Sequence, residues 1–256
     1  MYPEELEKYL ELQQISKELA QTISEYYHIR ETQIRWWNVT EFFKDTKKIT
    51  ISPLNKHQFN KLINGSYGIY GLTIINKYLS MVYYNDTSIA SRQHFTILHE
   101  LSHIQLHSNT KNETYSSLII GNDYSAEDTI KEQEANTLAS QLLINDSALN
   151  QYINNGFKFN QICKEFEISH EALKNRIKNY LKYYYIKNNI DCCEEDKIIQ
   201  NPFIYANSIT TKYMDDQKYI LNHSKNLPPK TETARQPTAN TTVKLARGYY
   251  YHCGFF

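Results

Sequence analysis

The amino-acid sequence predicts an α+β protein in which two helices that carry polar side chains pack against a small β-sheet. The first observation is that residues 89–107 and 127–144 repeat apolar side chains at helical spacing. The second is that two short β-rich runs, 69–75 and 79–84, stand before the first of these helices. The third is a helix-turn-helix-like pattern at 159–181.

Length, charge and hydropathy narrow the class of protein. A chain of 256 residues can bury a sizeable core. Its 28 basic and 28 acidic residues cancel, which argues against a general attraction to nucleic acid. The chain starts with charged residues and holds no apolar run near the roughly 18 residues of a membrane span. We therefore expect a cytoplasmic protein without a signal peptide or a membrane partner.

We expect three parts along the chain. Residues 1–150 form the main domain, residues 151–190 a helix-turn-helix-like segment, and residues 191–256 an extension that is partly flexible. The N-terminal stretch 4–32 has helical spacing, and the aromatic cluster after it is expected to pack in the core. The cysteines form no C-x-x-C pair and are expected to be ordinary thiols: Cys163, Cys192, Cys193 and Cys253.

The helix at 89–107 carries the residues His99-Glu100-Leu101-Ser102-His103, which fit the pattern H-E-x-x-H. On a helical wheel the two histidines lie one turn apart on one face, with apolar residues behind them. Two neutral imidazoles at this spacing can bind one zinc ion, and Glu100 beside them can act as general base. The alternative is a chance match, so a third protein ligand is the test.

The helix at 127–144 offers that third ligand. Glu132 shares a face with Ala135, Asn136 and Ala139, whose small side chains permit a close approach of the first helix. Asn136 can then hydrogen-bond the ligand region. Glu134 lies in a different row of the helix, with Leu138 and Gln141. It is the alternative ligand, although helical phase favours Glu132.

The segment 159–181 has two interpretations. As a DNA reader, its second helix would present basic side chains to the phosphates: Lys174, Arg176, Lys178 and Lys182. As a packing or docking module, the same side chains would simply be solvated. We favour the second interpretation because the turn is tight and the charge excess is modest.

Together, "RQHFTILHELSHIQLH" and "EQEANTLASQLLIN" resemble the ImmA/IrrE-like metallopeptidases. The resemblance covers roughly residues 60–185, with Leu138, Ser102 and Ile144-Asn145 as mild departures. It implies a zincin-like metallopeptidase core and one zinc ion per chain, bound by His99, His103 and Glu132, with Glu100 as general base. It also implies an endopeptidase that cleaves a helix-turn-helix transcriptional repressor.

Small zincin-like folds place strands over the active-site helix, and an edge strand can bind substrate in extended form. We expect the second β-rich run to be that edge: Leu79, Ser80, Met81, Val82, Tyr83 and Tyr84. The alternative is a hairpin that only completes the core. Candidates for stabilising the oxyanion are Tyr115, Tyr124 and the tyrosines of this strand.

Two other functions stay open from the sequence. One is a DNA-binding transcriptional regulator that uses 159–181 and retains a metal for structure. The other is a non-catalytic partner-binding protein with a vestigial site. The intact motif with Glu132 argues against decay, and no fourth Cys or His is placed to close a structural zinc site.

Overall fold

A computed structural model describes residues 2–55, 57–58, 61, 69–75, 80–107, 113–118, 126–187, 192–194, 197–199, 242–245 and 249–252. The chain divides into two compact units. Unit 1 comprises Met1–Asp146 and Phe166–Ser169, and unit 2 comprises Ser147–Glu165 and His170–Phe256. Among the described residues, no helix combines the length and the apolar character that crossing a membrane requires.

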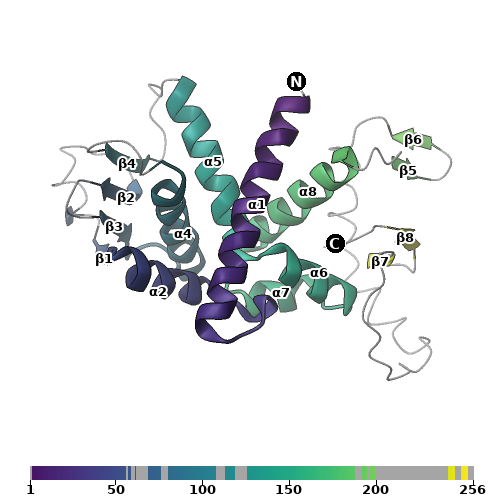
Figure 1. Cartoon of the computed structure of the whole chain (residues 1–256), viewed down its shortest axis with the longest axis horizontal. Coiled ribbons are helices and arrows are strands. Elements are labelled where there is room, and N and C mark those ends of the chain that lie inside the picture. Colours follow the sequence, from purple (N-terminus) through teal and green to yellow (C-terminus); the bar gives the residue numbers. More distant parts are fainter. Residues whose placement is uncertain are drawn as a thin grey trace. The chain divides into compact units, whose positions relative to one another are not determined.

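Unit 1 is built around two long helices, α4 (Ala90–His107) and α5 (Ala126–Leu143). Both predicted helices, 89–107 and 127–144, are therefore confirmed to within about one residue at each end. The buried side of α4 includes Ile97, Leu101 and Ile104, as the helical wheel predicts. Helix α4 lies between α5 on one side and a small β-sheet on the other (Figure 1).

Two further helices of unit 1 come from the N-terminal part of the chain. They are α1 (Tyr2–Tyr27), which packs on α5, and α2 (Trp36–Lys47), which packs on α4; the short helix η1 (Glu31–Gln33) lies between them in the chain. Helix α2 begins where the backbone N–H of Arg35 donates to Oδ1 of Asn38, 2.9 Å away. It ends at Lys48, which has the left-handed backbone conformation common after helices.

The sheet of unit 1 has the strand order β1-β3-β2-β4. Its strands are β1 (Thr50–Leu54), β2 (Ile69–Ile75), β3 (Ser80–Asn85) and β4 (Glu113–Leu118). Strand β3 is parallel to β1 and antiparallel to β2, and β2 is antiparallel to β4. The two predicted β-rich runs are thus confirmed as neighbouring strands, and β1 and β4 form the edges.

The prediction that residues 79–84 form an edge strand is wrong. Ser80, Met81, Val82, Tyr83 and Tyr84 lie in β3, which is hydrogen-bonded to β1 on one side and β2 on the other; Leu79 lies outside the described residues. Because both rows of main-chain groups are already paired, β3 cannot accept a further strand. A substrate that adds to this sheet as a strand must use another element.

Unit 2 contains the helix-turn-helix-like segment. Its helices are α6 (Asp146–Asn154), whose first residue belongs to unit 1, α7 (Phe159–Glu165) and α8 (His170–Lys187). Two strand pairs follow, β5 (Cys192–Glu194) with β6 (Lys197–Ile199), and β7 (Thr242–Leu245) with β8 (Tyr249–His252). Of the predicted extension 191–256, the described residues are 192–194, 197–199, 242–245 and 249–252.

The four residues between α7 and α8 belong to unit 1. Phe166 is buried beneath the guanidinium of Arg35, whose Cζ lies 4.2 Å from the ring centroid, and Ile168 is also buried. Glu167 accepts a hydrogen bond of 2.9 Å from Nε1 of Trp36. On α8, Arg176 is only 3% exposed, so its side chain is not among those that could contact DNA.

Candidate metal centre

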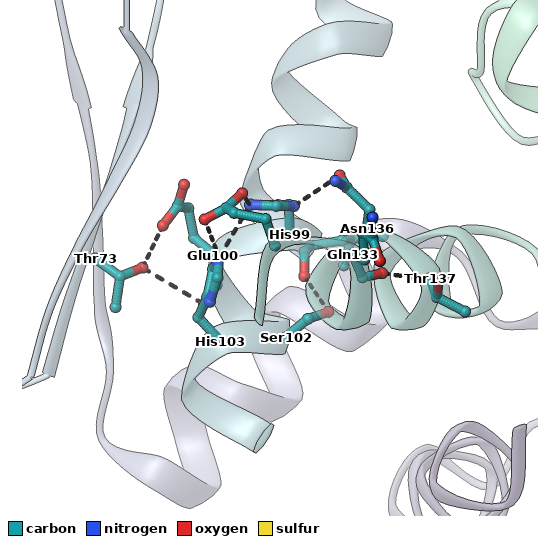
Figure 2. A network of polar contacts seen from close by, with 10 residues as sticks. Thr73, His99, Glu100, Ser102, His103, Gln133, Asn136 and Thr137 are labelled. Carbon is teal, nitrogen blue, oxygen red and sulfur yellow. Dashed lines mark hydrogen bonds and ion pairs between the residues drawn. The ribbon is translucent and has the colours of Figure 1, made fainter. Parts of the chain in front are cut away.

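Two histidines of α4 bring their ring nitrogens together. His99 and His103 are one helical turn apart, and both are buried, with 3% and 0% of their surface exposed. Their Nε2 atoms are 3.1 Å apart, and the rings lie edge to face (Figure 2). The predicted imidazole pair is therefore present, and it faces the interior of unit 1.

The carboxylate of Glu132 on α5 completes this cluster. Its Oε2 lies 3.2 Å from Nε2 of His99, and its Oε1 lies 3.2 Å from Nε2 of His103. Burial by itself would raise the pKa of Glu132, but hydrogen bonds from His103 and His99 outweigh it and lower the pKa to about 2. Burial opposes the charged form of His99, yet the neighbouring carboxylates outweigh it and raise the pKa of His99.

These three residues fit a metal ion. Ligand atoms about 2.0–2.1 Å from a tetrahedral zinc ion are separated by roughly 3.3 Å from one another. The separations between the two ring nitrogens and the carboxylate oxygens are 3.1–3.2 Å. Of the described residues, His99, His103 and Glu132 are the cluster whose donor atoms can hold a metal ion. Two imidazoles and one carboxylate leave a fourth position for a reactant, as catalytic zinc sites do.

Asn136, one turn after Glu132 on α5, orients the first histidine. Its Oδ1 lies 3.0 Å from Nδ1 of His99 (Figure 2). When Nδ1 carries the proton and donates it to the amide oxygen, the lone pair of Nε2 points to the cluster. The place of Asn136 on the same helical face as Glu132 predicts this hydrogen bond.

Glu100 lies beside the histidine pair on the side of the sheet. It is fully buried, and its Oε2 accepts a hydrogen bond of 2.6 Å from the hydroxyl of Thr73 on β2 (Figure 2). Gly71, two residues earlier on the same strand, lies directly against the other oxygen, Oε1. Neither Thr73 nor Gly71 was predicted as a site residue from the sequence. A glycine inside a β-rich run was the available signal, because it marks a close approach of the backbone to another group.

The second acidic candidate, Glu134, faces away from this cluster. Its Oε1 forms an ion pair of 2.9 Å with Nζ of Lys8 on α1, and its Oε2 lies 3.8 Å from Nε2 of His107. Burial, followed by the nearby His103, lowers the pKa of His107. The structure thus brings Glu132 to the histidines and directs Glu134 to the N-terminal helix.

The tyrosines expected to stabilise an oxyanion are only partly described. The hydroxyl of Tyr83 contacts Sδ of Met81, 3.3 Å away on the same strand. The backbone of Tyr115 on β4 is in register with Thr73, while its side chain and the whole of Tyr124 lie outside the described residues. Their predicted role stays a prediction.

A buried H-E-x-x-H helix, a glutamate on the next helix and a small mixed sheet together define a zincin-like metallopeptidase core of the α+β class. Residues 65–178 match a family model described as the IrrE N-terminal-like domain, a family of peptidases that is zinc-dependent in general. Over these residues the chain is similar to the ImmA/IrrE family. A comparison with curated proteins finds no match.

Proposed function

We propose that this protein is a zinc-dependent endopeptidase. The observation that carries the proposal is the convergence of His99, His103 and Glu132, with the buried carboxylate of Glu100 beside them. Three ligands with an open fourth position are typical of catalytic zinc, whereas structural zinc has a closed shell of four. The match of residues 65–178 to a peptidase family supports the same activity.

Each residue of the centre has a distinct task in this reaction. Zinc, when bound, supplies a Lewis acid that polarises the peptide carbonyl and makes water a stronger acid. Glu132 offers its carboxylate oxygens beside the two Nε2 atoms as the third ligand. Asn136 holds His99 in the tautomer that offers Nε2. Glu100 takes the proton from the attacking water and passes it to the leaving amine.

We propose a helix-turn-helix transcriptional repressor as the substrate, and derepression of a mobile-element, prophage or stress operon as the outcome. The support is the resemblance of the two sequence blocks to ImmA/IrrE-like enzymes and the match of residues 65–178 to that family. Enzyme and repressor would have to share the cytoplasm for this reaction to occur.

The test combines metal content with cleavage. The wild type, Glu100→Gln and the control Glu41→Gln, which changes an exposed glutamate of α2, are loaded with zinc and assayed on repressors encoded next to the gene. We expect one zinc ion per chain in all three proteins. We expect cleavage to fall by about a hundredfold or more in Glu100→Gln only, since a general base contributes 10²–10⁴-fold.

Two results would contradict the proposal. One is a wild-type protein that takes up no metal on reconstitution, because the three ligands would then not form a site. The other is cleavage by Glu100→Gln at the wild-type rate, because the reaction would then not use this carboxylate as a base.

A further inference from the structure

Strand β2 crosses helix α4 at the position of the general base. The hydroxyl of Thr73 lies 2.6 Å from Oε2 of Glu100 and 3.4 Å from the backbone oxygen of the same residue. Thr73 and Glu100 are both fully buried. A threonine hydroxyl has one proton to donate, and the shorter contact to the carboxylate identifies where it goes. A separation of 2.6 Å is typical of a hydroxyl that donates to an ionised carboxylate.

Gly71 allows the strand to approach this closely. A Cβ atom at position 71 would lie 2.5 Å from Oε1 of Glu100, 3.0 Å from its Cδ and 2.6 Å from Cγ2 of Thr96. Side chains larger than hydrogen would therefore displace either the carboxylate or the strand. The missing side chain leaves a slot in which the carboxylate lies against the backbone of β2.

Together these contacts restrain both oxygens of the base. They narrow the range of positions open to the Glu100 carboxylate, and a base that must find its position at each turnover is less effective. The restraint comes from a strand that is itself paired on both sides, with β3 and β4, so it is rigid.

We propose that Thr73 is a positioning residue for catalysis, which acts by holding the carboxylate of Glu100, and that Gly71 provides the room for it. This inference rests on the proposed function, because it takes Glu100 to be the base. A positioning role predicts a larger effect of losing the Thr73 hydroxyl than a packing role does. Valine has the shape of threonine and favours strands, so a position that serves only to pack the strand would tolerate Thr73→Val.

The experiment compares Thr73→Val, which removes the hydroxyl, with Thr73→Ser, which keeps it, and with Thr40→Val. Thr40 is the matched control because it is a buried threonine of unit 1 whose hydroxyl bonds to the backbone oxygen of Trp36. Each protein is loaded with cobalt, and acetohydroxamate is titrated while the visible absorption of the metal is followed. A hydroxamate suits this purpose because a carboxylate beside the metal can accept the proton of its acidic O–H, which strengthens binding.

We expect all variants to bind one metal ion. Thr73→Val should bind acetohydroxamate about ten- to a hundredfold more weakly, the loss expected for a hydrogen bond to a charged group. The kcat of Thr73→Val for cleavage of the repressor should fall by a similar factor, with KM changed by less than about twofold. Thr73→Ser should recover most of both losses, and Thr40→Val should behave as the wild type.

Gly71→Ala provides a second route to the same answer if Thr73→Val does not fold. Its methyl group should displace the carboxylate and weaken acetohydroxamate binding without loss of the metal. Wild-type binding by Thr73→Val or Gly71→Ala, or a Thr73→Ser variant as weak as Thr73→Val, would overturn the proposal. Should Glu100→Gln itself bind and cleave as the wild type does, the fault lies instead with the proposed function.

Discussion

At the residue scale, Glu132 and Glu134 stand two positions apart on α5 and serve different partners. Glu132 lies between the two histidines of α4, and Glu134 lies between Lys8 of α1 and His107. A rotation of about 200° between residues two apart on a helix explains the division. Glu132 thus faces the candidate metal centre, and Glu134 faces the N-terminal helix.

Removing each carboxylate in turn should separate these roles. We expect Glu132→Ala to lower zinc affinity by about a hundredfold or more, because one of three ligands is lost. We expect Glu134→Ala to keep the metal and to lose at most about 1 kcal/mol of stability, since Lys8 is 43% exposed and its ion pair is screened. Metal content after dialysis measures the first effect, and urea denaturation the second. Retention of zinc by Glu132→Ala with loss in Glu134→Ala would reverse the assignment.

His94 gives the free energy of unfolding a dependence on pH. Its ring is stacked on Trp36, and burial lowers its pKa below the ordinary value of about 6.5, although contacts with Glu167 oppose the shift. As the pH falls through 6.5, the unfolded chain binds this proton before the folded protein does. The free energy of unfolding should therefore decrease below pH 6.5, until the folded imidazole is protonated too.

The variant His94→Phe isolates this contribution, because it keeps a ring on Trp36 that does not titrate. We expect its urea midpoint to fall less than that of the wild type between about pH 7.5 and about pH 5.5. Equal decreases in the two proteins would show that another group carries the pH dependence.

At the scale of single elements, the end of α2 carries backbone strain that can be relieved. Lys48 follows the helix with φ 55° and ψ 40°, a conformation that costs side chains about 1 kcal/mol and glycine almost nothing. We expect Lys48→Gly to raise the free energy of unfolding by about 0.5–1 kcal/mol in urea, with the slope unchanged. Lys48→Ala is the control and should gain nothing. A glycine variant no more stable than the alanine variant would contradict this expectation.

The helices were more predictable than the sheet, for a physical reason. Spacing along α4 and α5 decides which side chains share a face, so local pattern pairs His99 with His103 and Glu132 with Asn136. The family resemblance then joined the two pairs into one site. Strand partners depend on contacts between distant segments, and β1 was not recognised. Its sequence, TISPL, contains Pro53, which is typical of an edge strand. Missing β1 made β3 look like an edge.

At the scale of the whole molecule, the N-terminal helices α1 and α2 pack against helices of the family-matched domain, which begins later in the chain. The family match covers residues 65–178, yet α1 supplies Lys8 to Glu134, and α2 supplies Lys47 to Gln105 of α4, 2.6 Å away. Thr73 and Gly71 could not be assigned from sequence for a related reason. Their partner Glu100 is 27 residues away from Thr73, and only the packing of strand on helix brings them together.

Metal binding should stabilise the folded protein as a whole. An ion that binds only the folded state at a thousandfold above its Kd contributes about 4 kcal/mol, which corresponds to roughly 10 °C in Tm for a domain of this size. We expect a chelator to lower the Tm of the wild type by about this amount. The variant His103→Ala, which lacks a ligand, should show little change. A wild type insensitive to chelator and to added zinc would argue against a tight site.

The position of the two tryptophans has an optical consequence. Trp36 and Trp37 are the only two in the sequence, and they are neighbours at the start of α2. The indole of Trp36 is stacked on His94 at 3.9 Å and donates to Glu167 in the segment between α7 and α8. All tryptophan emission of the protein therefore originates at one corner of unit 1. Its intensity and wavelength report, without any label, on the charge of His94. They also report on whether Phe166–Ser169 is packed against the start of α2.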